Sequence, residues 1–309
     1  MRDYLLKREI GDIDIATSAT PQKIQKIFPS VIPVGIEHGT VIVRHRKQSF
    51  EVTTFRTEGK YTDQRHPDEV VFIDQINEDL KRRDFTMNAL AMDKQGEIID
   101  LFNGQKDLQN RLIRAVGDGH KRLHEVPLRM IRAIRFSSQL GFHIEQETLK
   151  QMIAVKKEIE TVAVERILIE CEKLFAGDHV NLGIDYLRKT KIYHHLPVMI
   201  KYPYIMERFP VLKTPLHSFG EVIACFHQIE KKIPISMWCN KWKCSNKIKR
   251  EAMTLTKAIH TYKTNKGLNR WLVYQLPKNL VNGFVRLMHS LDDDAPQNRV
   301  GEPGAGFVT

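Results

Sequence analysis

Two aspartates separated by one residue, Asp12 and Asp14, are the residues whose type and spacing most directly predict chemistry. In a β-strand, residues i and i+2 project from the same face, so these carboxylates would lie side by side, with Ile13 and Ile15 in the core. Two carboxylates about 4 Å apart repel each other by about 4 kcal/mol at an effective dielectric constant near 20. Such a pair favours a divalent cation, and oxygen ligands beside phosphate substrates favour Mg²⁺.

A third carboxylate, Glu51, lies on a neighbouring predicted strand, where it points away from the face of Phe50 and Val52. Three acidic groups on adjacent strands can hold two metal ions for nucleotidyl or phosphoryl transfer. The alternative for the aspartate pair is a solvated Asp-x-Asp at a sheet edge, which is the commoner case when such a pair stands alone. The pair therefore needs support from the rest of the sequence.

Residues 10–100 alternate stretches typical of strands and of helices. Thr20 is a good helix N-cap and Pro21 a good first residue, so a helix is expected from Pro21 to about Phe28. Charged and turn-forming residues predict a loop over 59–68. The remaining predicted elements are strands at 13–15, 41–43, 49–55 and 98–100 and a helix at 76–91. Together they predict a mixed α/β domain that positions the carboxylates.

From about residue 105 onward the pattern becomes helical. Apolar residues recur at helical spacing in 128–140 and 162–175, and residues 217–290 are patterned in the same way. Four prolines between residues 197 and 215 predict a broken connection. Residues 292–309 have no periodicity and few large apolar groups, which predicts disorder.

Composition indicates a globular protein with a polyanionic partner. The chain has 309 residues, 42% of them hydrophobic, and a net charge of +11. A surplus this large favours nucleic acid as a partner. No apolar run could serve as a signal segment or a membrane span, so a cytoplasmic location is expected. The four cysteines form neither a disulfide framework nor a zinc pattern.

Several further segments accompany the aspartate pair in a fixed order. They are Arg2-Asp3-Tyr4-Leu5-Leu6, 12–21, Pro33-Val34-Gly35-Ile36-Glu37-His38-Gly39-Thr40, 50–56, Arg82-Arg83-Asp84-Phe85-Thr86-Met87-Asn88-Ala89 and 129–136. Over about residues 1–190 the chain resembles the class II tRNA nucleotidyltransferases, a family within the DNA polymerase β-like superfamily, in its bacterial CCA-adding branch. An ordered set of this kind is far more specific than a lone motif.

The resemblance implies an α+β fold, with a mixed-sheet nucleotidyltransferase head followed by an all-α neck and body. The implied domains are a head at 1–104, a neck at 105–190, a partial body at 191–291 and a disordered tail at 292–309. Both ends are expected to be shorter than in the family, because no strand ending in Gly-Gly precedes Arg2 and the last segment has no family likeness.

The resemblance also implies the reaction and its residues. Asp12 and Asp14 would hold Mg²⁺, and the tRNA 3′ hydroxyl would attack the α-phosphate of CTP or ATP without a nucleic-acid template. Arg2 would face the triphosphate, Arg83 would contact the nucleotide, and Asp84 and Asn88 its ribose. The base-reading helix would supply Arg129, Arg132 and Arg135, which recur every third residue and so share one broad side. The loop at 58–67 is similar to one that CC-only members tend to lack.

One substitution in the base-reading motif leaves alternatives open. Val126 stands where the family has an aspartate that accepts a hydrogen bond from the incoming base. Losing a charged acceptor costs about 1.5–3 kcal/mol. A catalytically degenerate RNA-binding remnant therefore stays an alternative, as do a poly(A) polymerase and a CC-only or A-only enzyme. A homodimer is compatible with the sequence, which carries no indication of oligomeric state.

Overall fold

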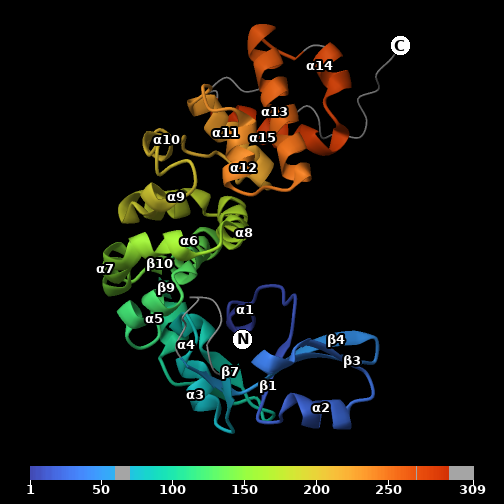
Figure 1. Cartoon of the computed structure of the whole chain (residues 1–309), viewed down its shortest axis with the longest axis vertical. Helices are drawn as coiled ribbons and strands as arrows, with labels where there is room; N and C mark the ends of the chain where they lie inside the picture. The colour runs from blue at the N-terminus through green and yellow to red at the C-terminus, as the bar shows by residue number, and fades with distance from the viewer. Residues whose placement is uncertain (60–69, 269, 292–309) are drawn as a thin grey trace. The chain divides into compact units, whose positions relative to one another are not determined.

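The computed structural model describes residues 1–59, 70–268 and 270–291, which fall into two compact units (Figure 1). The first unit comprises Met1–Ala133 and Phe142–Val162, and the second comprises Ile134–Gly141 and the described residues from Ala163 onward. The predicted loop at 59–68 and the predicted disorder of 292–309 lie almost wholly outside the described residues. The predicted division into head, neck, body and tail stays a prediction.

A four-stranded sheet with one covered face opens the first unit. Its strands have the order β1-β4-β3-β2, with β1 parallel to β4 and the other neighbours antiparallel. The strands are β1 (Asp14–Thr17), β2 (Val31–Gly35), β3 (Thr40–His45) and β4 (Gln48–Thr54). Val41, Val43 and Val52 form the core with Ile24 of helix α2 (Pro21–Ile27). The side chain of Thr20 caps α2 by accepting a hydrogen bond from the Lys23 backbone N–H at 3.4 Å, as predicted.

The two isoleucines around Asp14 do not join this core. Ile13 is 61% exposed and Ile15 is 42% exposed, so the prediction that both are buried is wrong. The reason is that β1 is the edge strand of the described sheet, paired only with β4. A side chain on an edge strand has neighbours on one side only.

The remainder of the first unit contains short elements. They are α1 (Arg2–Leu5), β5 (Arg56–Glu58), β6 (Val70–Phe72), α3 (Ile76–Lys81), β7 (Leu90–Met92), β8 (Ile98–Asp100), α4 (Gly104–Gln109), β9 (Leu112–Ile113), α5 (Gly119–Glu125), β10 (His143–Ile144), α7 (Gln146–Val155) and the 3₁₀ helices η1 (Ile36–His38), η2 (Thr86–Asn88) and η3 (Lys156–Thr161). The predicted helix over 76–91 is wrong beyond Lys81, because Phe85 is extended and pairs with Ala115. Tertiary pairing overrides the helical pattern there.

Helix α6 (Leu128–Leu140) begins in the first unit and ends in the second, which is helical throughout its described part. The other helices are α8 (Val164–Phe175), α9 (Val180–Thr190), η4 (Ile192–His195), α10 (Tyr204–Glu207), α11 (Phe219–Ile229), α12 (Ile235–Lys241), α13 (Asn246–Thr264), α14 (Arg270–Gln275), η5 (Lys278–Leu280) and α15 (Val281–Leu291). The helices predicted at 128–140 and 162–175 are confirmed, and the proline-rich stretch carries only the short α10.

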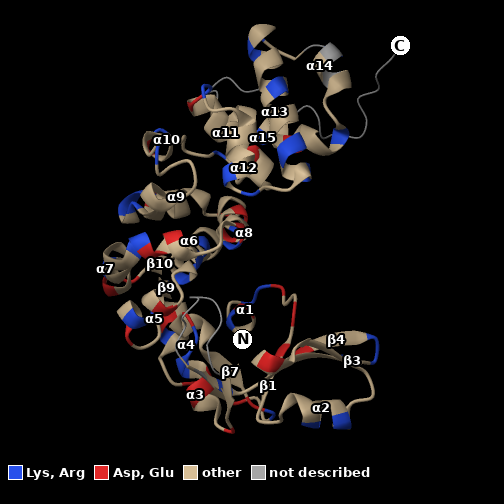
Figure 2. Ribbon diagram, in the orientation of Figure 1, with Lys and Arg blue, Asp and Glu red and all other residues tan. Residues whose placement is uncertain are grey.

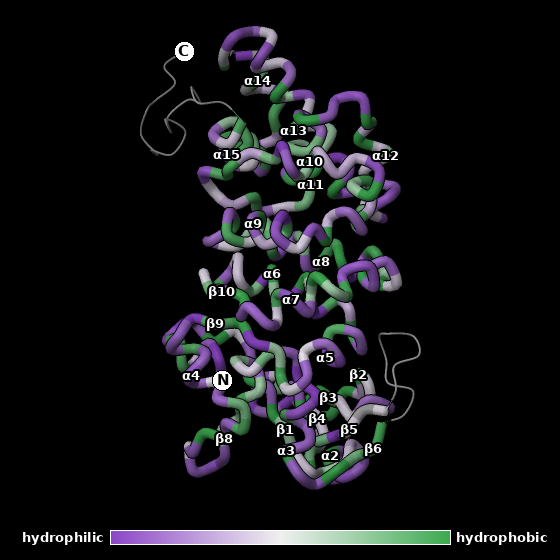
Figure 3. Tube along the Cα trace, turned by 90° about the vertical axis from the view of Figure 1, so that its left-hand side faces the viewer, coloured by the Kyte–Doolittle hydropathy of each residue, from purple (hydrophilic) through white to green (hydrophobic). Residues whose placement is uncertain are grey.

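An aromatic cluster holds the second unit together. Phe226 of α11 stacks on Trp238 of α12, with ring centroids 5.0 Å apart, and Phe219 packs against Trp242 at the same distance. Hydrophilic and hydrophobic stretches alternate along the helices of this unit (Figure 3), as expected for helices that bury one face.

The four cysteines are free thiols, and the predicted α+β class is confirmed. None of the described helices combines the length and the apolar content needed to cross a membrane.

Candidate active site

Asp12 and Asp14 line one cavity of about 340 Å³ in the first unit. Asp14 is the first residue of β1, Asp12 precedes the strand, and both residues are exposed. Figure 2 shows acidic residues, in red, on the segment that joins α1 to β1. The other lining residues are Met1, which precedes α1, Asp3 and Tyr4 of α1, and Ile10 and Gly11 of the segment that joins α1 to β1. The two aspartates therefore open onto the same space, although only one of them is part of the strand.

Glu51 lies beside Asp14 in the sheet. The two residues are partners in the parallel register of β1 and β4, so their side chains project from the same face. No group of three or more His, Cys, Asp or Glu residues among the described ones is gathered closely enough to hold a metal ion. Two exposed carboxylates on a cavity still fit Mg²⁺, which takes one or two protein carboxylates together with substrate phosphates and water.

A second group of predicted site residues forms a continuous hydrogen-bonded network. Arg2 donates from Nη1 to Asn88 Oδ1 at 3.0 Å, and Asn88 donates from Nδ2 to Asp84 Oδ1 at 3.0 Å. Arg132 donates to Asp84 Oδ2 from Nε at 2.9 Å and from Nη2 at 2.7 Å. Arg83 donates from Nη1 to the Asn88 carbonyl oxygen at 3.1 Å. Five of the seven residues predicted to bind nucleotide are thus joined.

Asp84 is the centre of this network and is only 8% exposed. Burial acts to raise the pKa of its carboxyl group, but the charge of Arg132 and the hydrogen bond from Asn88 outweigh burial and hold the pKa below its usual value. The Phe85 backbone N–H also donates to Asp84 at 2.8 Å. The short helix η2 turns the chain so that Asn88 returns to Asp84 four residues later. Asp84 is therefore an ionised, fully hydrogen-bonded carboxylate at neutral pH.

The three arginines of α6 have different partners. Arg129 is 8% exposed and donates to the carbonyl oxygens of Arg82 at 2.9 Å and Arg122 at 2.8 Å. Arg135, in the second unit, donates to Gln139 at 2.8 Å and forms an ion pair with Glu170 at 2.6 Å. Arg132 joins the Asp84 network through its ion pair, and the charge of Arg129 also acts to lower the pKa of Asp84. The predicted contacts of Arg129 and Arg135 with a base stay predictions.

Asp79 is a buried acidic residue that sequence reasoning missed. It is 2% exposed and pairs with Arg82 at 2.8 Å and with Arg83 at 3.5 Å, three and four residues later. Acidic and basic residues at these helical spacings stand next to each other, so the pattern could have been found in the sequence. Asp79 therefore orients the side chains of Arg82 and Arg83, and Arg83 in turn donates to the Asn88 carbonyl oxygen.

Two family models match the chain. The poly A polymerase head domain matches residues 1–114, and the probable RNA and SrmB-binding site of polymerase A matches residues 141–202. The CCA-adding enzyme of Oceanobacillus iheyensis is 50% identical over 295 residues, which cover 94% of this chain and 73% of that enzyme. The chain belongs to the CCA-adding enzyme family. It is therefore a nucleotidyltransferase, as the ordered motifs predicted.

Other members of the family agree. The CCA-adding enzyme of Anoxybacillus flavithermus is 43% identical over 309 residues, which cover 96% of this chain and 74% of that enzyme. The crystal structure of the Bacillus stearothermophilus CCA-adding enzyme in complex with CTP superposes with a TM-score of 0.85 at 34% identity, covering 96% of this chain and 72% of that one. The first and second units both fall within these matches.

Proposed function

We propose that this CCA-adding enzyme extends the 3′ end of tRNA with C and A, using CTP and ATP and no nucleic-acid template. The single observation that carries the proposal is the shared cavity of Asp12 and Asp14, with Glu51 in register beside Asp14. The enzyme from Bacillus stearothermophilus, similar over nearly the whole chain, was crystallised with CTP. A paired-carboxylate site and a nucleotide-binding relative support the same reaction.

The carboxylates set the position of the reaction. Asp12 and Asp14 would hold Mg²⁺, which neutralises charge on the phosphates and orients the attack. The tRNA 3′ hydroxyl loses its proton to water as its oxygen forms a bond to the α-phosphorus. The bond between the α-phosphorus and the oxygen shared with the β-phosphate breaks, and pyrophosphate leaves with that electron pair. We propose Glu51, the register partner of Asp14, as the third carboxylate of the site.

The hydrogen-bonded network positions the nucleotide. Arg2 belongs to α1, of which Asp3 and Tyr4 line the cavity, and we propose that the Arg2 guanidinium faces the triphosphate. Asn88 joins Arg2 to Asp84, and Arg132 holds Asp84 in one orientation. We propose that Asp84 and Asn88 fix the ribose end of the nucleotide while Arg2 fixes its phosphate end. Holding the ribose and the phosphates of the nucleotide at a fixed distance would orient the α-phosphorus toward the tRNA 3′ hydroxyl without the help of a template.

The base would be read at the start of α6. Glu125 pairs with Arg122 at 3.0 Å and lies 3.6 Å from Arg129, so acidic and basic groups meet there. We propose that Arg129, Arg132 and Arg135 belong to the base-reading helix as the family motif implies. The side chain of Val126 offers no hydrogen-bond acceptor to a base, which favours the alternative of a degenerate RNA-binding remnant.

An extension assay tests the proposal. A tRNA lacking its CCA end is incubated with the full chain, Mg²⁺ and labelled nucleotide, and products are resolved to single nucleotides. CTP alone is expected to add two residues, and CTP with ATP is expected to add three. Binding of the tRNA without extension would establish the remnant instead, and a long run of A would establish a poly(A) polymerase.

A further inference from the structure

Two of the four free cysteines lie where α12 turns into α13. Cys239 is buried near the end of α12, and Cys244 follows the helix and is partly exposed. The Lys243 backbone N–H donates to the Asn240 carbonyl oxygen at 3.2 Å, and the Cys244 backbone N–H donates to the Cys239 carbonyl oxygen at 2.8 Å. Lys243 has the left-handed conformation, with a φ angle of 51°. Together these features form a Schellman cap at the end of α12.

The Schellman cap brings the two cysteines together. In such a cap, the residue after the turn contacts the residue at the position of Cys239 in the last turn of the helix. Given the 2.8 Å bond from Cys244 N to Cys239 O, standard backbone dimensions put their Cα atoms no more than about 6.7 Å apart. Disulfide-bonded cysteines have Cα atoms about 4.4–6.8 Å apart. The reduced chain therefore already holds the pair within the range of a disulfide.

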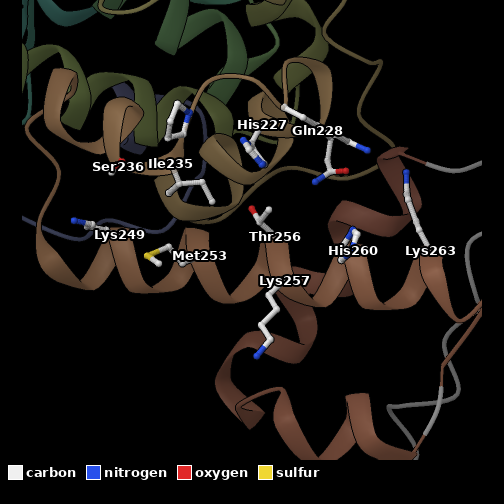
Figure 4. A pocket seen from close by; sticks show the side chains of 12 residues that line it. His227, Gln228, Ile235, Ser236, Lys249, Met253, Thr256, Lys257, His260 and Lys263 are labelled. Atoms are coloured by element: carbon white, nitrogen blue, oxygen red, sulfur yellow. The ribbon is translucent and has the colours of Figure 1, made fainter.

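The surroundings of the pair favour a thiolate. The hydrogen bond from the Cys244 thiol and the charge of Lys249 lower the pKa of Cys239, although burial acts to raise it. The same hydrogen bond, with burial, raises the pKa of Cys244. Lys249 belongs to α13, which packs against α12, and it lines a cavity of about 700 Å³ with Ile235 and Ser236. Figure 4 shows these three residues at the same end of the cavity.

The other two cysteines have a different environment. Cys171 of α8 and Cys225 of α11 are 2% and 0% exposed, and burial raises the pKa of each thiol to about 12. Because a thiol reacts through its thiolate, these two are unreactive in the folded chain at neutral pH. They provide a comparison within the same molecule.

We propose that Cys239 and Cys244 form a redox-reversible modification site, which a low-molecular-weight disulfide closes to an intramolecular disulfide and excess thiol reopens. The inference does not depend on the proposed function of the chain. The closed form ties α12 to the residue before Ser245, which caps α13 by accepting from the Ile248 N–H at 3.4 Å. Oxidation therefore fixes the junction between the two helices.

The disulfide forms in two exchange steps. Cys244 reacts first because solvent reaches it, and its proton can pass across the hydrogen bond to the Cys239 thiolate. The Cys244 thiolate attacks one sulfur of the oxidant, the S–S bond of the oxidant breaks, and one thiolate leaves with the electron pair. Cys239 then loses its proton to water and attacks Cys244 Sγ, and the second thiolate leaves. The two cysteines are oxidised, and the oxidant is reduced to two thiols, which take up two protons from water.

Oxidation of the folded wild-type chain by glutathione disulfide tests the proposal. Lys241 and Lys243 lie between the two cysteines, so trypsin separates Cys239 from Cys244 unless a disulfide joins them. After alkylation of free thiols, mass spectrometry should find residues 233–241 linked to residues 244–247. Reduction by dithiothreitol should remove this linked product. A folded chain without the linked product, or with a disulfide that includes another cysteine, would overturn the proposal.

Comparison with the unfolded chain tests the role of the Schellman cap. At a fixed ratio of glutathione to glutathione disulfide, the equilibrium constant for forming the disulfide should be at least about tenfold larger in the folded chain than in guanidinium chloride. By linkage, the oxidised chain should unfold about 3–6 °C above the reduced chain. An equal or smaller constant in the folded chain, or a lower unfolding midpoint after oxidation, would overturn the proposal.

Variants separate the roles of the two thiols. Cys239→Ser keeps the exposed thiol without its partner, so it should accumulate Cys244 as a mixed disulfide with glutathione, at least about tenfold more than the wild type does. Cys244→Ser should form no linked product, and the matched control Cys171→Ala should form it as the wild type does. Equal amounts of the mixed disulfide in Cys239→Ser and in the wild type would contradict the second exchange step and overturn the proposal.

Discussion

Replacing Asp84 by asparagine probes the network that joins the predicted nucleotide-binding residues. Asparagine keeps the shape of the side chain but offers one acceptor oxygen, whereas Asp84 accepts from Phe85, Asn88 and Arg132. Removing one partner of a buried ion pair costs about 3–5 kcal/mol. Because the Arg132 side chain is 34% exposed, we expect the lower end, about 3 kcal/mol. That loss lowers the unfolding midpoint by about 6–12 °C for a domain of 150–250 residues.

The same variant has a predictable dependence on pH. The folded-state pKa of Asp84 is lowered, so its ionised form contributes stability that is fully present above the unfolded pKa of about 3.9. This stability is lost as pH falls through the folded pKa. The difference in midpoint between the wild type and Asp84→Asn should therefore be constant from pH 7 to about pH 5 and should narrow below about pH 4.

Thermal unfolding followed by circular dichroism at several pH values measures both effects. A double-mutant cycle with Arg132→Gln should give a coupling energy of about 1–3 kcal/mol. Glu78→Gln removes a carboxylate from an exposed pair with Lys81 and should cost no more than about 0.5 kcal/mol. An Asp84→Asn midpoint within 1 °C of the wild type at pH 7, or a difference that widens in acid, would refute this account of the network.

Three further outcomes are expected. The variant Val126→Asp with Pro127→Ala should raise selectivity for C and A over other bases by about 10- to 150-fold in single-nucleotide addition, and unchanged selectivity would contradict the base-reading assignment. Gly104→Ala should lower the free energy of unfolding by about 2–3 kcal/mol in denaturant, because the added Cβ would lie 2.3 Å from the Thr86 carbonyl oxygen. The control variant Gly11→Ala adds a Cβ that meets nothing within 4 Å, so it should cost less than about 1 kcal/mol. Chelation of divalent ions by EDTA should stop nucleotide addition and leave tRNA binding by anisotropy within about threefold.

The sequence predicted the elements that depend on local patterns. Stretches rich in β-branched residues predicted strands β3 and β4, and Thr20 with Pro21 predicted the start of α2. The exposure of Ile13 and Ile15 was not predictable from alternation, because alternation does not say whether a strand lies at the edge of a sheet.

The sequence predicted the members of the Asp84 network but not the contacts between them. The ordered motifs singled out Arg2, Asn88, Asp84 and Arg132, but the bonds between them join residues up to 86 positions apart. Helical spacing placed Arg129 and Arg132 on one broad side of α6, yet their partners are set by tertiary packing. The periodicity of a sequence predicts which residues share a face of one helix or strand. It does not predict which residue of another helix or strand that face contacts, because this depends on the tertiary fold.

Nucleotide addition by wild type and by Asp14→Asn, on the same tRNA lacking CCA, tests the central claim most directly. Asp14 is exposed at the start of β1, so the variant should unfold within about 1 °C of the wild type and bind tRNA equally well. The account predicts that its rate of CTP addition falls by at least about 100-fold, since the paired carboxylates would no longer hold the ion that activates the phosphates. An Asp14→Asn enzyme that adds CTP within about threefold of the wild-type rate would contradict the account.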